Sequence, residues 1–535
     1  MAATNVASPA AARAGGLGEG VRARDRPAIA AAATVAALTL VGAVLRVIVA
    51  GQSVFADELS TFWISATHSL GGVLSLMYST GRIHHAEITP PLSFLASWLT
   101  TRAGTSPELL RLPALIAGTA TIALVYLVGL RTVGRRAALL AAALTALSPF
   151  MIYYSAEARA YGLMMFFLVG ATLSLLLALD TGRRRWWVLY ALCAAAAFYT
   201  HYTSLFVLGA QFVWVLWARP AARQAVLLAS AGAALLAVPW IPGLIEDLRS
   251  PTLKILSALS PFTGNAVRID LQHWSLGYPY TVAGGLNDLP GVPSLVLLGV
   301  ALLLAAGGIV LRAAHGGLRA PGRRAVLVAA LMLVTPLGEI VISAFGNHII
   351  GVRDLAASWP YLALTSAALV FAAGPRAGAI GAGLAVVAFG LAAPKMLEAR
   401  FARPDYQAAA AYVSTHGRPG DAVIDGTGGL SPGPLTGFDV AYHGRLPVFR
   451  ALAPAERDHP FTVFDKVVPL QAALGNAIAA AHGGRVFTVS AVLPQIKMPD
   501  LLAPPALPGG YRLRARRVYR GIQLTIVSVY ARSPR

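Results

Sequence analysis

The sequence predicts a mainly α-helical membrane protein in which a bundle of about eleven spans precedes a smaller, water-facing α/β domain. Of the 535 residues, 56% are hydrophobic and only 12% are charged, whereas soluble domains carry about 25% charged residues. Apolar runs of roughly 20 residues recur from residue 26 to residue 393, and each is long enough to cross a hydrocarbon core about 30 Å thick. From residue 394 onward, charges and prolines separate short apolar runs, and this change predicts the α/β domain.

The hydropathy pattern sets the expected boundaries of these spans. They are residues 27–50, 109–130, 136–154, 160–179, 186–200, 202–218, 224–242, 291–312, 324–345, 355–373 and 376–393. Residues 1–25 are rich in Ala, Gly and Arg, and we expect a disordered cytoplasmic N-terminus there. The single cysteine, Cys193, lies in an apolar run, so an internal disulfide and a thiolate metal cluster are excluded.

Arginine clusters between the spans indicate the orientation. They recur in alternate connections, at residues 131–136, 183–185, 219–223, 312–324 and 376, and cytoplasmic loops of membrane proteins carry such an excess. The net charge of +20 therefore reflects topology rather than nucleic-acid binding, because the arginines form no single patch. This orientation places the loops 51–108 and 243–290 and the domain 394–535 outside. The abundance of Ala and Arg suggests a GC-rich genome, and hence a bacterial inner membrane.

The two long segments outside the spans carry their own patterns. Within the loop 51–108, the stretches 61–78 and 91–102 mix apolar and polar residues, and we expect interfacial helices there. In the domain 394–535 we expect helices at Asp405–Val413 and Ala472–Ala481, strands at Ala422–Ile424 and Val486–Val489, and two paired strands within Arg512–Ala531. We expect this domain to guide an acceptor rather than to perform chemistry.

Ionisable side chains from distant segments converge on the outer face. They are Asp57, Glu58, Glu87, Glu157, Arg159, Tyr161, His201, Tyr202, His348 and Arg353. Ionisable groups beside the hydrocarbon are costly, so such a cluster predicts a functional site. Each residue also has a simpler explanation: the acids as solvated loop residues, Arg159 as an interface anchor and His201 as a buried, hydrogen-bonded histidine. Glu339, near the middle of a span, is expected to be structural.

Four runs in this order resemble a known family. They are Phe55-Ala-Asp57-Glu58, Glu87-Ile-Thr-Pro90-Pro91-Leu92, Tyr154-Ser-Ala-Glu157-Ala-Arg159-Ala-Tyr161 and Thr200-His201-Tyr202. Together they resemble the GT-C glycosyltransferases, specifically bacterial relatives of the dolichyl-phosphate-mannose–protein mannosyltransferases. The resemblance covers about residues 27–375. It implies a GT-C-type bundle, a lipid-phosphate sugar donor, an inverting transfer, and an acidic first-loop residue acting as base, here Asp57.

The sequence departs from this family at two points. Many relatives carry His directly before the Pro-Pro, where this chain has Thr89. Many carry an Arg-Tyr pair before the late span, where this chain has Arg353 and Asp354. Neither departure disturbs the acidic pair, but both leave the acceptor and the fine geometry of the site open.

The residue types fit this chemistry independently of the family. A polyprenyl-phosphate sugar is already activated, and the sequence contains neither a P-loop nor a dinucleotide fingerprint. The phosphate leaving group needs positive charge, which Arg159, Arg353 or His201 could supply. The acceptor hydroxyl needs one general base, so Asp57 and Glu58 are the catalytic candidates. Glu87, Arg159, Tyr161, His201, Tyr202 and Arg353 are the candidate substrate-binding residues, with Arg159 expected on the donor phosphate.

The expected function is transfer of a sugar, mannose or a related one, from a polyprenyl-phosphate donor to an acceptor of the cell envelope. The acceptor could be a glycan, a lipid or a protein, and the sequence does not choose among them. No cofactor is required, but a divalent cation at Asp57 and Glu87 is an alternative, because hard cations favour carboxylate oxygens. The rival functions are a transporter or lipid flippase, and a non-catalytic envelope-assembly protein.

Overall fold

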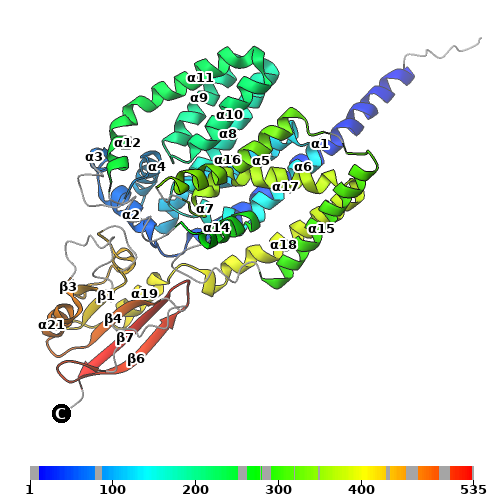
Figure 1. Cartoon of the computed structure of the whole chain (residues 1–535). Coiled ribbons are helices and arrows are strands. Elements are labelled where there is room, and N and C mark those ends of the chain that lie inside the picture. The colour runs from blue at the N-terminus through cyan, green and yellow to red at the C-terminus, as the bar shows by residue number, and fades with distance from the viewer. Residues whose placement is uncertain are drawn as a thin grey trace, which may run out of the picture.

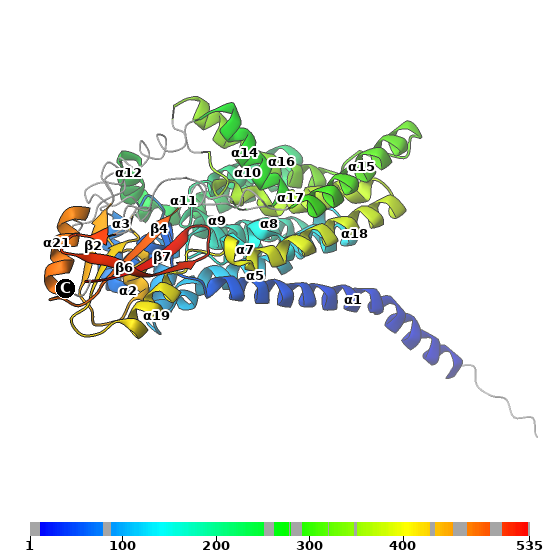
Figure 2. The same cartoon turned by 90° about the horizontal axis from the view of Figure 1, so that it is seen from below.

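The computed structural model describes residues 11–78, 87–250, 262–277, 279, 291–318, 320–346, 350–428, 434–452, 468–492 and 506–532. A helical bundle makes up most of the chain, and a sheet with flanking helices lies against one end of it (Figure 1). Helix α1 runs along one edge of the bundle (Figure 2). It begins at Ala11, inside the segment 1–25 for which we expected disorder.

Each expected span coincides with a helix or a pair of helices. They are α1 (Ala11–Ala50), α5 (Pro107–Thr132), α6 (Arg135–Leu147) with α7 (Pro149–Ser155), α8 (Tyr161–Thr181), α9 (Arg184–Phe198), α10 (Ser204–Ala218), α11 (Arg223–Ala237), α15 (Val292–Ala314), α16 (Arg323–Ala344), α17 (Trp359–Ala372) and α18 (Pro375–Ala392). In the described part of the chain, eight helices are long and apolar enough to span, or nine if α6 and α7 form one span. Helices α9 and α10, with 15 residues each, are shorter than the roughly 20 residues that cross a bilayer.

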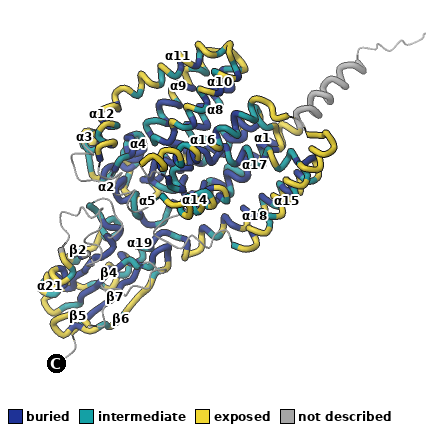
Figure 3. Tube along the Cα trace, viewed as in Figure 1, coloured by how far each residue is buried: buried dark blue, intermediate teal, exposed yellow. Residues whose placement is uncertain are grey.

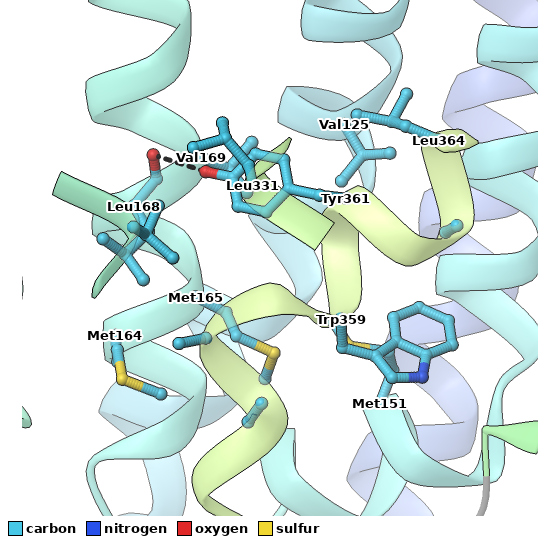
Figure 4. Close-up of a cluster of buried hydrophobic side chains, with 14 of the residues drawn as sticks. Val125, Met151, Met164, Met165, Leu168, Val169, Leu331, Trp359, Tyr361 and Leu364 are labelled. Carbon is cyan, nitrogen blue, oxygen red and sulfur yellow. Dashed lines mark hydrogen bonds between the residues drawn. The ribbon is translucent and has the colours of Figure 1, made fainter. Parts of the chain in front are cut away.

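Burial separates the centre of the bundle from its surface (Figure 3). Side chains of α5, α7, α8, α16 and α17 form a shared apolar core around Trp359 and Tyr361 (Figure 4). The Tyr361 hydroxyl donates to the Leu168 carbonyl oxygen at 3.0 Å, so the one polar atom of this ring is satisfied inside the core. Helix α15 instead exposes large side chains such as Leu302 and Leu303. An apolar outer surface of this kind is stable only against lipid.

The long loop after α1 folds into three short helices, α2 (Asp57–Thr67), α3 (Leu70–Tyr78) and α4 (Leu92–Thr101). The stretch 61–78 is thus divided at His68, while the expected helix at 91–102 is confirmed. Helices α2 and α4 pack together, and the Ser65 hydroxyl donates to the Phe94 carbonyl oxygen at 3.0 Å. Helices α12 (Ile241–Arg249) and α14 (Gly264–Leu276) lie in the second long connection.

The C-terminal region is the expected α/β unit. Its seven-stranded sheet has the order β3-β2-β1-β4-β7-β6-β5. The strands are β1 (Ala422–Gly426), β2 (Val448–Leu452), β3 (Val468–Pro469), β4 (Val486–Val492), β5 (Ala506–Leu507), β6 (Tyr511–Tyr519) and β7 (Leu524–Arg532), and the first four are parallel. Helices α19 (Tyr406–His416) and α21 (Leu470–Ala480) pack against the sheet through separate apolar clusters. Each of the predicted helices and strands in this region is confirmed.

The carboxyl end of β1 points toward the bundle. The chain leaves β1 for the short helix α20 (Gly437–Ala441), and Leu435 and Val440 there pack against Leu59 and Phe62 of α2. The sheet region therefore rests on the loop that carries the acidic pair predicted from the sequence.

A buried arginine stabilises the bend between α6 and α7, which is 59°. Pro149 has no N–H to donate to the Thr145 carbonyl, and the Phe150 N–H donates instead to Gly277 O at 2.9 Å. The carbonyls of Thr145 and Ala146 are thus left without helical partners. The fully buried Arg46 of α1 donates to both, at 3.0 and 3.2 Å.

We predict that Arg46→Met lowers stability although it adds apolar surface. Two buried carbonyls would lose charge-assisted hydrogen bonds, which costs about 2–4 kcal/mol in total. Thermal unfolding in detergent measures the effect, with Arg135→Met as the control because Arg135 is exposed on α6. Equal melting temperatures for the two variants would contradict this role of Arg46.

Candidate active site

The connections at the sheet-facing end of the bundle bring most of the predicted site residues together. Asp57 and Glu58 begin α2, and Glu87 precedes α4. Arg159 lies between α7 and α8, and Tyr161 is the first residue of α8. His201 separates α9 from α10, and Arg353 precedes α17. The segments are joined directly, since the Leu92 N–H donates to the Tyr199 carbonyl oxygen at 3.0 Å.

The backbone before the acidic pair is strained. Ala56 has φ 51° and ψ −126°, a conformation that residues other than glycine rarely adopt. Such strain persists only where the surroundings hold it, and it is concentrated at functional sites. It starts α2 directly at Asp57, and the two successive carboxylates then find different partners.

Glu58 is the centre of a buried ionic cluster. The Arg111 guanidinium donates to both of its oxygens, at 2.7 and 2.6 Å, and Arg403 lies 3.3 Å from it on another side. The Ala158 N–H donates to the same carboxylate at 2.8 Å. Burial alone would raise the pKa of Glu58, but Arg111 and Arg403 outweigh it and lower this pKa below its ordinary value. With every side of the carboxylate occupied, Glu58 is placed to hold loops together rather than to meet a substrate.

Arg111 and Arg403 were not identified as site residues from the sequence, although both lie unusually close to apolar spans. Arg111 lies in the first turn of an apolar span, and Arg403 follows the last span. Arg111 also donates to the carbonyl of Ser53 at 2.9 Å, and Arg403 donates to that of Ala156 at 3.1 Å. Charged groups so close to hydrocarbon need partners, but the partners lie in segments that only the fold brings near.

Glu87 and Arg159 form a second, two-point ion pair. The guanidinium donates to the two carboxylate oxygens at 2.6 and 2.9 Å. Arg159 also donates to the Thr89 hydroxyl at 3.1 Å, and this hydroxyl in turn donates to Glu87. Thr89 thus completes the pair at the position where many relatives carry His.

Asp57 and Arg353 form the third pair, in which the guanidinium donates to the carboxylate. Their side chains are 28% and 39% exposed, whereas those of Glu58, Arg111, Glu87 and Arg159 are at most 8% exposed. Burial would raise the pKa of Asp57, but the positive charges of Arg353 and Arg159 lower it below its ordinary value. Of the three carboxylate–guanidinium pairs in the site, this one is the most open to solvent.

His201 and Tyr161 lie beside this pair. Their ring centroids are 5.5 Å apart, and His201 Nε2 is 3.4 Å from a carboxylate oxygen of Asp354. Burial, reinforced by Arg353 and Arg159, lowers the pKa of His201 to about 3. The imidazole is therefore neutral at physiological pH and acts as a hydrogen-bonding group rather than as a cation.

Glu157 adds a carboxyl group with a different proton affinity. Burial and the nearby Glu58 carboxylate raise the pKa of Glu157 to about 7. One of its oxygens is buried and has no hydrogen-bond partner among the described residues. Glu157 is therefore a carboxyl group near the Glu58 cluster whose raised pKa lies close to neutral pH.

The other predicted residues that the structure describes take no part in these three ion pairs. The Tyr202 hydroxyl donates to Asp247 and accepts from Trp240 at 2.9 Å, so Tyr202 ties α10 to α12 and does not join the cluster. Glu339 is fully buried within α16. His348 lies outside the described residues. Within the described part of the chain, no three His, Cys, Asp or Glu side chains are arranged to hold a metal ion.

We predict that Glu58→Gln destabilises the protein, because it leaves two buried guanidinium groups without their carboxylate. Breaking a buried ion pair typically costs about 3–5 kcal/mol. Since the pKa of Glu58 is lowered in the folded state, its contribution is present above the ordinary value of 4.5 and is lost as pH falls through the lowered pKa. The loss of stability on acidification should therefore be shallower in Glu58→Gln.

Thermal unfolding across pH tests this prediction, with Glu398→Gln as the matched control. Glu398 pairs with Arg400 at the surface, where its side chain is 45% exposed, and exposed pairs contribute little. If Glu58→Gln melts at the same temperature as Glu398→Gln, the buried cluster does not hold the site together.

The chain is similar in part to one protein family and, in fold, to solved structures. Residues 88–242 match a family described as dolichyl-phosphate-mannose-protein mannosyltransferase. The crystal structure of ArnT from Cupriavidus metallidurans bound to undecaprenyl phosphate has a TM-score of 0.50 and 14% identity, covering 92% of this chain and 97% of that chain. An Archaeoglobus fulgidus oligosaccharyltransferase tethered with an acceptor peptide has a TM-score of 0.46 and 13% identity, covering 78% and 63%. No curated protein matches the chain in sequence.

The matched segment 88–242 contains Arg159, Tyr161 and His201, and it begins just after Glu87. The likeness to ArnT extends over nearly the whole chain and shows the fold. The protein is therefore a multi-pass membrane protein with the GT-C glycosyltransferase fold, and the resemblance to the dolichyl-phosphate-mannose–protein mannosyltransferases that its four sequence runs indicate is confirmed.

Proposed function

We propose that this protein transfers a sugar from a polyprenyl-phosphate donor to an acceptor hydroxyl, with Asp57 as the general base and Arg353 as the ligand of the donor phosphate. The observation that carries the proposal is the partly exposed Asp57–Arg353 pair. It presents one carboxylate and one guanidinium at a site whose other ion pairs are closed off. Base and leaving-group clamp are the two groups that this transfer requires.

The reaction uses these groups in one displacement. Asp57 accepts the proton of the acceptor hydroxyl as its oxygen forms a bond to the anomeric carbon. The bond from that carbon to the phosphate oxygen breaks, and the electron pair leaves with the polyprenyl phosphate. Arg353 stabilises the negative charge that grows on the phosphate. A single displacement of this kind inverts the anomeric carbon.

The pairing of Asp57 with Arg353 makes the base depend on the donor. While Arg353 donates to Asp57, it lowers the pKa of that carboxylate and weakens it as a base. A phosphate that takes over the guanidinium would remove this contact and raise the pKa of Asp57 toward the value that burial favours. The base therefore becomes competent when the donor is bound, which favours binding of the donor before the acceptor.

Arg159 fits a supporting role better than the phosphate ligand that we expected from the sequence. Both of its terminal nitrogens already donate to Glu87, and a phosphate would have to displace a buried carboxylate. Its charge still acts on Asp57 and His201. Likewise Glu58, a catalytic candidate from the sequence, serves as a structural residue in this proposal.

The fold and the chemistry of the site support a polyprenyl-phosphate donor. ArnT, whose fold this chain shares, was crystallised with undecaprenyl phosphate. A lipid-anchored donor places its phosphate at the membrane surface, close to the start of α2. We therefore propose an inner-membrane enzyme of a bacterium whose site faces away from the cytoplasm, and a glycan, lipid or protein of the cell envelope as acceptor. Mannose or a related sugar is the proposed cargo.

The two rival functions predict other behaviour. A flippase would move the lipid without breaking its sugar–phosphate bond, and an assembly protein would not need Asp57. The exposed acid–cation pair at one membrane face favours chemistry over transport, because a transporter places its binding groups near the bilayer midplane.

We predict that Asp57→Asn folds and binds donor but transfers sugar about 10²–10⁴-fold more slowly, the usual contribution of a general base. The amide keeps the size of the side chain but cannot accept the proton. Sugar transfer from synthetic polyprenyl-phosphate sugars by purified protein measures the rate, with donor binding measured in parallel. Glu398→Gln, which changes a surface acid outside the ion pairs of the site, is the control and should be unaffected. If Asp57→Asn turns over at nearly the rate of the control, another carboxyl group must be the base. Glu157, whose pKa is raised to about 7, would then be the first candidate.

We predict that Arg353→Gln weakens binding of the donor by about 10–100-fold, since a hydrogen bond from a charged group contributes roughly 1.5–3 kcal/mol. Arg353→Lys should bind donor more tightly than Arg353→Gln, because lysine keeps the positive charge. It should still bind less tightly than arginine, because an ammonium cannot make the two-point hydrogen bond of a guanidinium. Arg159→Gln should instead lower the melting temperature, because Glu87 would remain buried without its partner. Titration with polyprenyl phosphate and thermal unfolding separate the two effects. Donor affinity that drops only in Arg159→Gln would reverse the assignment.

A further inference from the structure

A cavity of about 450 Å³ lies at the opposite end of the bundle from the candidate active site. It is bounded by the ends of α8 and α10, the start of α9, the turn before α11 and the start of α16. Helix α8 begins at Tyr161 in the active site and has 21 residues, so the two sites are about 30 Å apart along its axis. The junction of α10 and α11 lies far from the sheet region (Figure 1).

The walls of the cavity combine apolar surface with positive charge. Leu179, Trp187 and several alanines supply the apolar part, and Arg219 and Arg323 supply two guanidinium groups. No carboxylate lines it. A volume of this size is in the usual range for small-molecule pockets, about 300–1,000 Å³.

Neither guanidinium is neutralised by a neighbour. Among the described residues, Arg219 and Arg323 take part in no ion pair, whereas the adjacent Arg324 pairs with Asp180. The Nε atom of Arg219 is buried and has no hydrogen-bond partner in that part of the chain. One Arg323 nitrogen donates to the Ala218 carbonyl at 3.1 Å, which holds this side chain at the cavity. Arg323 is exposed and Arg219 is partly buried, so two unpaired guanidinium groups remain available at the cavity, and such groups bind phosphate through charge-assisted hydrogen bonds.

The surroundings strengthen the attraction for an anion and expose it to lipid. Helix α9 begins at Arg184 and α11 at Arg223, and the positive ends of helix dipoles favour negative charge. Trp217, Leu227 and Leu228 are exposed nearby on α10 and α11, so the outer wall is apolar. Such a combination is found where a membrane surface meets its headgroups.

We propose that this cavity binds the phosphate headgroup of an anionic phospholipid through Arg219 and Arg323. Basic pockets between spans on the cytoplasmic side are a known kind of site for anionic headgroups, and the arginine clusters place this end on that side. The apolar walls favour a lipid over a free anion, because they would cover the first part of an acyl chain. General positive charge at a cytoplasmic face needs no cavity and leaves no buried guanidinium atom unpartnered, so it does not account for this geometry.

The test compares lipid binding by two double variants of the full-length protein. Arg219→Gln with Arg323→Gln removes the two cavity charges, and Arg135→Gln with Arg136→Gln removes two exposed charges from the start of α6. Native mass spectrometry of delipidated protein in detergent measures the affinity for phosphatidylglycerol and for phosphatidylcholine. Inorganic phosphate serves as a competitor. Arg323→Gln alone is the fallback if the cavity double variant does not fold, because Arg323 is exposed.

The expected result is a clear preference of the unaltered protein for phosphatidylglycerol. The cavity double variant should lose about 30-fold in affinity, since each arginine near a lipid headgroup contributes about 1 kcal/mol. The control double variant should keep the affinity. Equal losses in the two double variants, equal binding of the two lipids, or displacement of phosphatidylglycerol by inorganic phosphate alone would each overturn the proposal. None of these measurements depends on sugar transfer.

Discussion

The carboxylate of Glu58, held between Arg111 and Arg403, is the interaction on which the rest of the site depends. Through Arg111 it fixes the end of α1 and the strained turn before α2, and through the Ala158 N–H it fixes the loop that carries Arg159. Replacing such a cluster with apolar residues is often neutral for stability. Here the polar groups do what apolar ones could not, because they bind backbone atoms of two separate segments, 50–55 and 156–158, and so hold the turn from which Asp57 starts.

Burial then divides the ionic groups of the site into two kinds. The Glu58 and Glu87 pairs are closed to solvent and keep their geometry, whereas Asp57 and Arg353 remain partly open. The two buried pairs are already in place around the Asp57–Arg353 pair. Fixed charges of this kind favour electrostatic catalysis, because they need not reorient when charge develops during the reaction. The proposed exchange of Arg353 from Asp57 to a phosphate uses the one pair that can change partners without exposing a buried charge.

Much of this arrangement was predictable because hydropathy and charge act locally along a membrane protein. The apolar runs located the bundle helices, and the arginine clusters predicted a face on which Asp57, Glu87, Arg159, His201 and Arg353 indeed meet. Side-chain partners were not predictable, since they depend on how helices pack. Asp57 and Glu58 are adjacent in the sequence, but Asp57 pairs with Arg353 and Glu58 with Arg111. Likewise, the Tyr202 hydroxyl bonds to Asp247, although its neighbour His201 lies in the cluster. The segment 136–154 was predicted as one uninterrupted span, so neither the bend at Pro149 nor its compensation by Arg46 from another helix was anticipated.

The position of Arg403 changes how the C-terminal region relates to the chemistry. We expected from the sequence that this region guides an acceptor, but Arg403 reaches from it to Glu58, one residue away from the proposed base. The backbone around Arg403 is held from both sides: its N–H donates to Gln52 of the first loop at 3.0 Å, and the Ala402 carbonyl accepts from Ile522 beside β7 at 2.8 Å. An acceptor that displaces the sheet region would therefore move the Arg403 guanidinium, and with it the Glu58 cluster. Arg403 is thus the direct link between the sheet region and the Glu58 cluster that adjoins Asp57.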